Sequence, residues 1–298
     1  MPNHIAVMFN QAAGLGKRRE ELRWAVESMQ QRGVDIRLEP LRHDQPWQEQ
    51  IEARLAEGID TLVAAGGDGT VNSIALYLLD TDCRLGVVPL GTCNHFAKHI
   101  GIPLDVTAAL DIAIHGHTEL IDVGEVNGVP FLNFSSIGLY ADILTAFAAR
   151  QRLGWPKRLA LLRACVDILR PYAPLRVGFA KGSEGTEVQT PLVFVGNNRY
   201  ALGGVDLLQA CGDFRSGILQ VAYIRDRGRF GLLRLLTSAF WRHGQLKQNL
   251  TMTGLRAFQI VSPYRRLRVA IDGEVRVMQP PLHYQVRPQA LRVIVPPA

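Results

Sequence analysis

The stretch AAGGDGTVN, residues 64–72, places one aspartate, Asp68, among three glycines directly after an apolar run. Residues 61–65 are partly β-branched and uncharged, which predicts a strand buried on both faces of a parallel sheet. A helix that begins at the glycines would offer free N–H groups and the positive end of its dipole to an anion. A carboxylate repels phosphate unless a metal ion or a hydroxyl lies between them, so Asp68 predicts a nucleotide with magnesium. The alternative is a tight turn with a solvated aspartate.

A second strand-to-helix turn lies in VPLGTCNHFAKHIGIP, residues 88–103. Thr92 and Asn94 could hydrogen-bond a ribose or a phosphate there. The alternative is that one of them caps the N-terminus of the following helix. A third glycine-bearing turn, AAGLGK at residues 12–17, follows the first apolar run of the chain.

Two carboxylates, Asp272 and Glu274, flank Gly273 between two segments in which apolar and polar residues alternate. Asp-Gly in this setting predicts a two-residue hairpin turn. Two carboxylates at this spacing could also serve as a base and as an anchor for a metal or a hydroxyl. The residues do not distinguish these roles. Walker A, protein-kinase, HExxH and GxSxG motifs are absent from the sequence.

The elements that must position these groups change in character near residue 124. Strand and helix patterns alternate up to about residue 122, which predicts a parallel α/β sheet with ligands at the carboxyl ends of its strands. Beyond it, alternating apolar and polar segments predict an antiparallel β-rich domain. Two helical segments are expected to interrupt that domain, at residues 157–169 and 230–241.

Composition favours a globular protein with two cores. The chain has 298 residues, of which 47% are hydrophobic. The four cysteines form no CxxC pair, which is typical of a reducing compartment. The N-terminus lacks a signal-peptide pattern and no apolar run reaches spanning length, so we expect a cytoplasmic protein. The net charge of +6 favours acidic partners, either nucleic acid or an anionic membrane surface.

Together, these motifs resemble the diacylglycerol kinase catalytic domain family, which includes bacterial lipid kinases and is related to sphingosine and ceramide kinases. The resemblance is carried, in this order, by GGDGTVN at 66–72, PLGTxNxFAxxxGIP at 89–103, IDVG at 121–124 and DGE at 272–274. GGDGT alone is shared with NAD kinases. The PLGTxNxFA run makes the resemblance specific to lipid kinases.

The resemblance implies an ATP-binding α/β domain at 1–123, a β-sandwich-like lipid domain at 124–285, and an active site in the cleft between them. A tail at about 286–298 could pack back on the first domain. Asp272 and Glu274 would activate the lipid hydroxyl, and Asp68 and Asp122 would join a magnesium and water network. The residues that would bind the nucleotide are Asn10, Gly66, Gly67, Asp68, Gly69, Thr70, Val71, Asn72, Gly91, Thr92, Asn94 and His95.

Four positions depart from the family pattern. They are Gln11 in place of proline, Ser73 in place of glutamate, His95 in place of aspartate, and Ser216 in the β-domain ion loop. The last leaves a second magnesium site near residues 213–218 in question. For His95 we expect contact with a nucleotide phosphate or with the water network of Asp68, the alternative being a simple capping position.

The activity implied is ATP- and Mg²⁺-dependent phosphorylation of a membrane lipid alcohol, with no nucleic-acid partner. Diacylglycerol, ceramide or a sphingoid lipid, and phosphatidylglycerol are all compatible substrates. An NAD kinase and a catalytically silent lipid- or nucleotide-binding regulator are the alternatives. A homodimer is left open.

We also expect peripheral attachment to an anionic membrane, because basic residues surround Trp155 and the apolar face of the segment at 157–169. These residues are Arg150, Arg152, Lys157, Arg158 and Arg163. A solvated basic face over an ordinary packed helix is the alternative.

Overall fold

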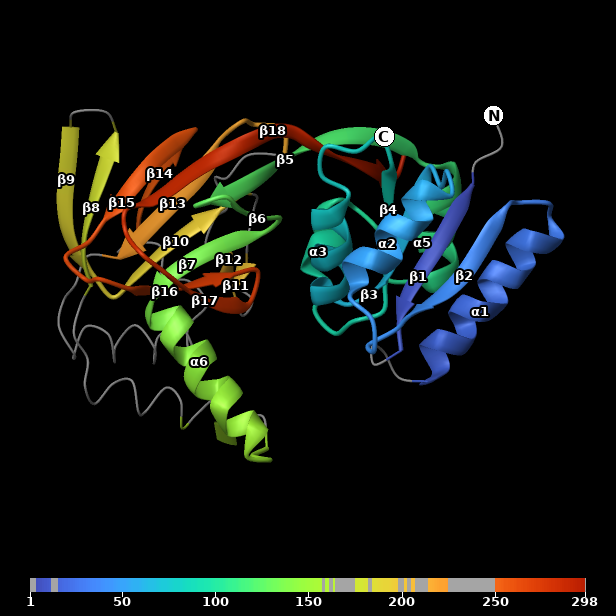
Figure 1. Ribbon diagram of the computed structural model, residues 1–298, viewed down its shortest axis with the longest axis horizontal. Coiled ribbons are helices and arrows are strands. Elements are labelled where there is room, and N and C mark those ends of the chain that lie inside the picture. Colours follow the sequence, from blue (N-terminus) through green and yellow to red (C-terminus); the bar gives the residue numbers. More distant parts are fainter. Residues whose placement is uncertain are drawn as a thin grey trace. The chain divides into compact units, whose positions relative to one another are not determined.

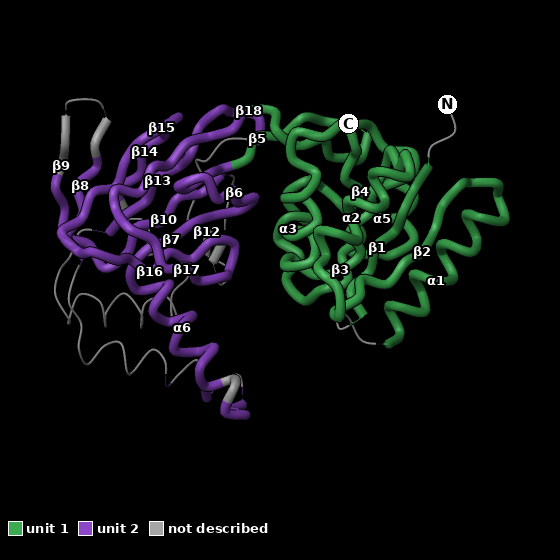
Figure 2. The backbone as a smooth tube through the Cα atoms, in the orientation of Figure 1, with its two compact units in different colours: residues 1–123, 288–298 green, residues 124–287 purple. Residues whose placement is uncertain are grey.

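A computed structural model describes residues 4–11, 16–156, 159–160, 163, 175–181, 184–197, 201–202, 205–206, 214–224 and 250–297. The chain forms two compact units, residues 1–123 with 288–298, and residues 124–287 (Figure 2). The expected helix at 230–241, most of the helix at 157–169 and the residues 12–15 of the first glycine turn lie outside the described residues.

Unit 1 is built on a parallel sheet, as the alternating pattern predicted. Its strand order is β2-β1-β3-β4-β18, and each pair along this order for β1 to β4 is parallel (Figure 1). At the end of the chain, Val293 in β18 pairs in parallel with Leu85 in β4. The strands are β1 (Ile5–Asn10), β2 (Ile36–Leu41), β3 (Thr61–Gly66), β4 (Arg84–Pro89) and β18 (Leu282–Val295).

Helices cover both faces of this sheet. Every residue of β3 is buried, which is typical of a parallel strand covered on both sides. Helix α1 packs against α5, and α2 packs against α3. The helices of unit 1 are α1 (Gly16–Gln31), α2 (Trp47–Ala56), α3 (Asp68–Tyr77), α4 (His95–His99) and α5 (Val106–His115).

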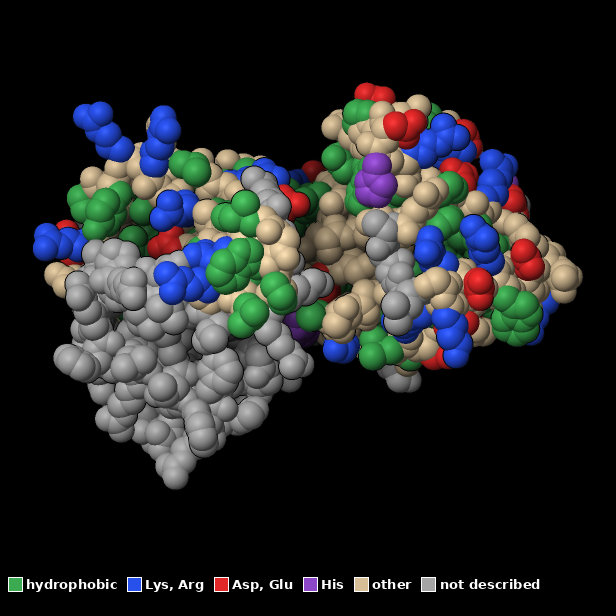
Figure 3. Space-filling model, turned by 90° about the horizontal axis from the view of Figure 1, so that it is seen from below, with side chains coloured by type: hydrophobic (Ala, Val, Ile, Leu, Met, Phe, Trp, Pro, Cys, Tyr) green, Lys and Arg blue, Asp and Glu red, His purple; other side chains and the backbone are tan. Residues whose placement is uncertain are grey.

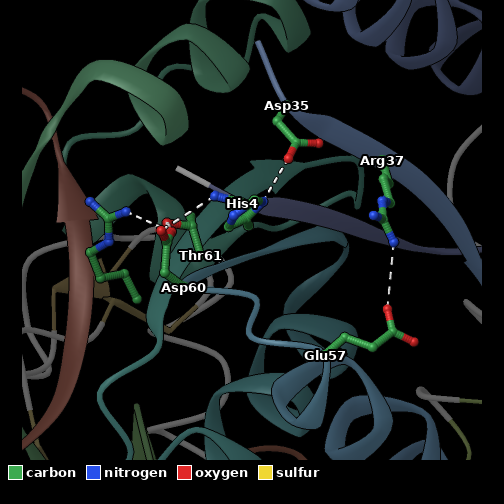
Figure 4. A network of polar contacts seen from close by, with 7 residues as sticks. His4, Asp35, Arg37, Glu57, Asp60 and Thr61 are labelled. Carbon is green, nitrogen blue, oxygen red and sulfur yellow. Dashed lines mark hydrogen bonds and ion pairs between the residues drawn. The ribbon is translucent and has the colours of Figure 1, made fainter. Parts of the chain in front are cut away.

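A polar network links the N-terminal ends of the strands in this sheet (Figure 4). Asp60, just before β3, accepts hydrogen bonds from the His4 backbone N–H at 3.3 Å and from Thr61 Oγ1 at 2.8 Å. Arg84, the first residue of β4, donates to Asp60 at 2.8 Å. His4 Nδ1 lies 2.6 Å from Asp35, which precedes β2. These contacts link the starts of four neighbouring strands, at the edge opposite the glycine turns.

Unit 2 is a two-layered antiparallel β structure. One sheet has the order β14-β13-β10-β7-β16-β17, with every neighbouring pair antiparallel. Its strands are β7 (Phe134–Gly138), β10 (Leu192–Gly196), β13 (Leu219–Ile224), β14 (Leu250–Leu255), β16 (Leu267–Ile271) and β17 (Glu274–Met278).

The second layer of unit 2 contains β15 with β8, β9 and the first part of β18, together with β6 and the last three residues of β5, which pair with each other. These strands are β5 (His117–Val126), β6 (Val129–Phe131), β8 (Leu175–Lys181), β9 (Glu184–Thr190) and β15 (Ala257–Val261). A short pair, β11 (Ala201–Leu202) with β12 (Val205–Asp206), forms a separate hairpin.

One hydrophobic core joins the two layers of unit 2. It contains Val195 and Val269 from the six-stranded sheet and Ile260 from the other layer, all buried. Phe258 and Tyr284 stack within it, with ring centroids 5.0 Å apart. The predicted antiparallel, sandwich-like fold of this part of the chain is therefore confirmed.

Helix α6 (Leu139–Arg152) follows β7 directly, and the sequence pattern had predicted no helix at these residues. It packs against β7, β16 and β17.

Candidate functional site

Two glycine turns of unit 1 meet at the carboxyl ends of β3 and β4. We call residues 66–72 and 91–96 together the turn junction. Gly66 and Pro89 are paired at the ends of these parallel strands, and the Leu90 N–H donates to the Gly66 carbonyl at 2.8 Å. The pairing of β3 with β4 therefore places both predicted turns at one edge of the sheet.

Gly67 and Gly91 touch so closely that neither turn could carry a side chain at this point without movement. A Cβ added to Gly91 would lie 2.5 Å from the Cα of Gly67 and 2.8 Å from Asn94 Oδ1. A Cβ on Gly69, in contrast, would meet no atom within 4 Å. Gly91 is thus a packing glycine, whereas Gly69 is exposed and leaves its backbone open to approach by a ligand.

Asp68 lies in the first turn of α3, as predicted, but its carboxylate reaches the other turn. Its Oδ1 accepts a hydrogen bond from the Phe96 N–H at 3.3 Å. The early N–H groups of a helix lack acceptors within the helix, so Asp68 satisfies one such group of α4. Part of its role is therefore to hold the two turns together. Because a carboxylate offers about four acceptor positions, capacity remains for a metal-bound water.

Asn94 does not make the side-chain capping bond that was one of the two roles considered for it from the sequence. It occupies the N-cap position of α4 in a left-handed conformation, with φ of 51°, and its side chain makes no capping bond. Instead, its Oδ1 accepts from the Gly91 N–H at 3.0 Å, and its Nδ2 donates to the Gly91 carbonyl at 2.8 Å. Asn94 is buried and closes the turn from inside. Thr92 is exposed.

The other predicted nucleotide residues divide into buried and accessible groups. Asn10 Nδ2 donates to Thr70 Oγ1 at 3.4 Å, which joins the end of β1 to α3. Val71 and Asn72 are buried in α3, and the Val71 N–H donates to the Gly67 carbonyl. His95 is the first residue of α4 and is half-buried. Within the junction, Gly69, Thr92 and Cys93 are exposed, and Gly67, Asp68, Gly91 and His95 are half-buried.

Asp122, the other predicted magnesium residue, is buried in β5, where its Oδ1 accepts from the Gln289 N–H at 3.0 Å. Across the described residues, no three His, Cys, Asp or Glu side chains come together as a metal-binding group. The protein alone does not build a cation cage there. Asp68 or Asp122 could hold Mg²⁺ only if nucleotide phosphates and water supplied most of its oxygens, which is usual for this ion.

The Asp272-Gly273 turn is a hairpin, as its sequence predicted. Ile271 pairs with Glu274, and both turn residues have positive φ, 46° for Asp272 and 93° for Gly273. Asp and Gly are among the residues that tolerate this conformation best. The hairpin joins β16 to β17.

The two carboxylates of this hairpin lie in different environments. Asp272 accepts hydrogen bonds from the backbone N–H groups of Leu132, Asn133 and Phe134, at 2.7, 2.9 and 3.0 Å. Burial raises the pKa of Asp272 to about 6, against the lowering effect of these bonds. Glu274 is exposed, and its nearest ion-pair partner is Arg276 at 3.8 Å. The loop at 132–134 carried no sequence signal for this role.

The comparisons with known proteins agree with this architecture. Residues 4–126 match the diacylglycerol kinase catalytic domain, and residues 136–295 match the YegS C-terminal NAD kinase beta sandwich-like domain. The chain is 31% identical to the "Probable lipid kinase YegS-like" of Pseudomonas fluorescens, over 93% of this chain and 91% of that protein. It is 29% identical to a "Diacylglycerol kinase" of Mycobacterium tuberculosis, over 98% and 95%.

Among solved structures, a diacylglycerol kinase from Bacillus anthracis strain Sterne matches with a TM-score of 0.73 and 20% identity, over 99% of this chain and 97% of that one. This likeness shows the fold. The α/β unit with paired glycine turns and the antiparallel unit together define a kinase of the lipid kinase class. The chain belongs to the diacylglycerol kinase catalytic domain family, which confirms the resemblance seen in its motifs.

In the part of the chain that the structure describes, no helix is long and apolar enough to cross a membrane.

Proposed function

We propose that this kinase transfers the γ-phosphate of ATP to the hydroxyl of a membrane lipid alcohol. The observation that carries the proposal is the turn junction, where two backbone turns lie in contact and the exposed Gly69 leaves room beside the first N–H groups of α3. Such an arrangement favours the phosphates of a nucleotide. Diacylglycerol is the first substrate to test, because relatives from Mycobacterium tuberculosis and Bacillus subtilis carry the name diacylglycerol kinase.

Within this proposal, Gly67, Gly69 and Thr92 contact the nucleotide, since Gly69 and Thr92 are exposed and Gly67 is half-buried beside them. Asp68 and Asp122 are the carboxylates that would order Mg²⁺ and its water. The bound ion would neutralise charge on the phosphates during transfer. Asp68 also fixes the second turn through the Phe96 N–H, so it positions the site even before the nucleotide binds.

Asp272 is the group that takes the proton from the lipid hydroxyl. A general base works best when its pKa lies near the working pH, and burial raises the pKa of Asp272 to about 6. Three backbone N–H groups hold its carboxylate in one orientation. Glu274, exposed at the start of β17, instead orients the substrate hydroxyl or head group.

In this proposal the protein reaches its lipid substrate by binding an anionic membrane through the residues near the end of α6. Three large apolar side chains are exposed there: Leu153 by 76%, Trp155 by 43% and Leu159 by 54%. Tryptophan is typical of membrane interfaces. Vesicle binding that rises with anionic lipid content and falls when Leu153 and Trp155 are replaced by serine would support this attachment; binding indifferent to lipid charge, salt and both changes would contradict it.

The test is incubation with γ-labelled ATP, Mg²⁺ and a total lipid extract, followed by identification of the labelled product. NAD is offered in a parallel reaction, because the second family match is named for a NAD kinase-like sandwich. Label in a lipid supports the proposal, and label in NAD supports a NAD kinase instead. ATP binding without transfer to either acceptor would favour the silent regulator.

A further inference from the structure

We propose that Asn197 is a positioning residue for Asp272, acting through the loop at 132–134 to hold the Asp272 carboxylate in place for proton transfer. This inference rests on the proposed function, in which Asp272 takes the proton of the lipid hydroxyl. Asn197 directly follows β10 and is buried, with 3% of its surface exposed. It does not touch the substrate in this inference, and its effect is transmitted by the backbone of the loop.

The loop at 132–134 is hydrogen-bonded on two sides. Its three N–H groups donate to the carboxylate of Asp272. Two of its carbonyls accept hydrogen bonds from Asn197. The Leu132 carbonyl accepts from Asn197 Nδ2 at 3.1 Å, and the Asn133 carbonyl accepts from the Asn197 backbone N–H at 3.0 Å. The loop is therefore fixed between Asn197 and Asp272.

Two peptide units of this loop are bonded at both ends. The first joins Leu132 to Asn133: its carbonyl accepts from Asn197, and its N–H donates to Asp272 Oδ1 at 2.9 Å. The second joins Asn133 to Phe134: its carbonyl also accepts from Asn197, and its N–H donates to the same Oδ1 at 3.0 Å. Hydrogen bonds in a chain polarise one another, so a bond accepted at the carbonyl makes the N–H a stronger donor. Asn197 therefore strengthens two of the bonds that Asp272 accepts.

The surroundings of this chain of hydrogen bonds are dry. Asn133, Phe134 and Asn197 are all buried. Hydrogen bonds are electrostatically stronger in such an environment than in water, and their polarisation of one another has more effect. A buried amide is also costly unless it is hydrogen-bonded. The Asn197 side chain makes its bond to the same loop whose N–H groups hold Asp272.

Uncharged groups control the ionisation of Asp272. Burial raises its pKa, while the three backbone bonds and a bond from the Asn133 side chain lower it. The hairpin of Asp272 belongs to β16 and β17, and β7 and α6 pack against it. None of the ion pairs among the described residues includes Asp272. The charged side chains that the structure describes on these four elements are Asp142, Arg150, Arg268, Glu274 and Arg276.

The loss of the Asn197 side chain should therefore weaken the hold on the ionised form of Asp272. The N–H of Asn133 becomes a poorer donor once the carbonyl of its peptide unit loses its partner. The pKa of Asp272 should then rise above its value of about 6. Less of the base is ionised in weakly acidic solution, so turnover there should fall.

The experiment compares wild type with Asn197→Ala and Asn197→Leu. Both changes remove the side-chain donor and keep the backbone N–H of residue 197, and the leucine refills the space that alanine leaves empty. Ser136→Ala is the matched control, because the Ser136 hydroxyl is also buried and donates to a backbone carbonyl, that of Val193, at 3.0 Å. Ser136 lies on β7, which pairs with β10, but its hydroxyl bonds β10 rather than the loop.

Two measurements are made on each folded protein. The ionisation of Asp272 is followed by NMR of isotope-labelled aspartate carboxyl carbons, and Asp272→Asn identifies its signal. This titration does not depend on kinase activity. Turnover and KM for ATP are then measured as a function of pH, and thermal unfolding shows that each variant retains the fold.

We expect acid dissociation of Asp272 to weaken by up to about tenfold in both Asn197 variants, the size of one hydrogen bond. Ser136→Ala should titrate as wild type does. Turnover of the Asn197 variants should fall most near pH 6 and approach that of wild type at about pH 8, where Asp272 is ionised in every protein, with KM for ATP unchanged.

An Asp272 titration that is the same in wild type and in the folded Asn197 variants would overturn the inference. A loss of turnover that is equal at every pH would also overturn it, because it would show a merely structural role. Either result leaves the proposed function standing if wild type labels lipid. A shifted titration in a protein whose wild type labels no lipid would support the link between Asn197 and Asp272 and contradict the proposed function.

Discussion

Two opposing effects set the chemistry of Asp272. Burial raises its pKa to about 6, while three backbone hydrogen bonds favour the ionised form. At neutral pH the carboxylate is therefore mainly ionised but still basic enough to accept a proton. Glu274, exposed only two residues away, lacks this environment. The structure thus distinguishes two groups that are equivalent in the sequence motif.

The pH dependence of turnover should reveal which carboxylate acts. Turnover of wild type should fall with decreasing pH below about 6, because protonated Asp272 cannot accept the hydroxyl proton. Asp272→Asn, which keeps a residue tolerant of positive φ, should lose roughly 10²-fold or more in turnover and lose this acid limb. Turnover of Glu274→Gln should still fall with decreasing pH below about 6, as in wild type. An unchanged limb in folded Asp272→Asn would show that another group takes the proton.

The contribution of Asp272 to the stability of the fold should decrease as pH rises, whereas its contribution to turnover should increase. The folded-state pKa of this aspartate is raised, so its contribution to stability is fully present below the unfolded value of about 3.9 and is lost as pH rises through about 6. Chemical unfolding of wild type and Asp272→Asn across this window measures the difference. The two curves should diverge between these pH values and run parallel above them.

Two glycines of the turn junction should behave differently when replaced by alanine. In Gly91→Ala the new Cβ would meet the backbone of Gly67, so we expect a loss of about 1–3 kcal/mol of stability. In Gly69→Ala the Cβ enters open space on α3, where alanine is favoured by up to about 1 kcal/mol. Thermal melting should therefore rank Gly69→Ala at or above wild type.

Turnover measurements distinguish the packing role of Gly91 from the proposed contact between Gly69 and a ligand. The Cβ of Gly69→Ala would occupy the space proposed for the nucleotide phosphate, so this stable variant should lose phosphotransfer and nucleotide affinity. Wild-type activity in Gly69→Ala would show that no phosphate approaches this position.

At the scale of elements, the sheet of unit 1 is fixed at its N-terminal edge by the network around Asp60. Burial raises the pKa of Asp60, but hydrogen bonds from Thr61 and Arg84 outweigh it and leave the pKa lowered. Stabilisation by this group is therefore present above the unfolded pKa of about 3.9 and is lost as pH falls through the folded value. The network secures the strands without taking part in the turn junction.

Asp60→Asn should be less stable than wild type at pH 7, and the difference should shrink on acidification below about pH 4. The matched control is Asp82→Asn, whose carboxylate pairs with Arg292 but is fully exposed, so solvent and salt should leave little effect. Urea unfolding at several pH values provides the measurement. A difference independent of pH would show that packing, not charge, explains the effect of Asp60.

The elements of unit 1 were predictable because buried parallel strands read as short apolar runs ending in glycine turns. Helix α6 was missed, since it begins directly after Gly138 at the end of β7, with no intervening loop to mark it. The contact of Asp68 with Phe96 spans 28 residues, and that of Asp272 with Leu132 spans 140. No local pattern encodes such pairings, so the sequence could not predict these partners.

For the molecule as a whole, the surface charge can be followed on one face of unit 1, where charged side chains are mixed rather than segregated. Figure 3 shows Lys and Arg interspersed with Asp and Glu on the face of unit 1 seen there. The net charge of +6 is therefore not expressed as one continuous basic surface on that face.

Phosphate transfer from γ-labelled ATP to vesicles of a total lipid extract measures directly whether this chain phosphorylates a membrane lipid. Wild type, Asp68→Asn and Asp272→Asn are compared after each is shown to be folded. The account predicts labelled lipid with wild type and roughly 10²-fold or greater loss in both variants, because each loses a charge needed for positioning or proton transfer. Labelled lipid formed equally by all three folded proteins, or no labelled lipid from wild type with any lipid of the extract, would contradict it.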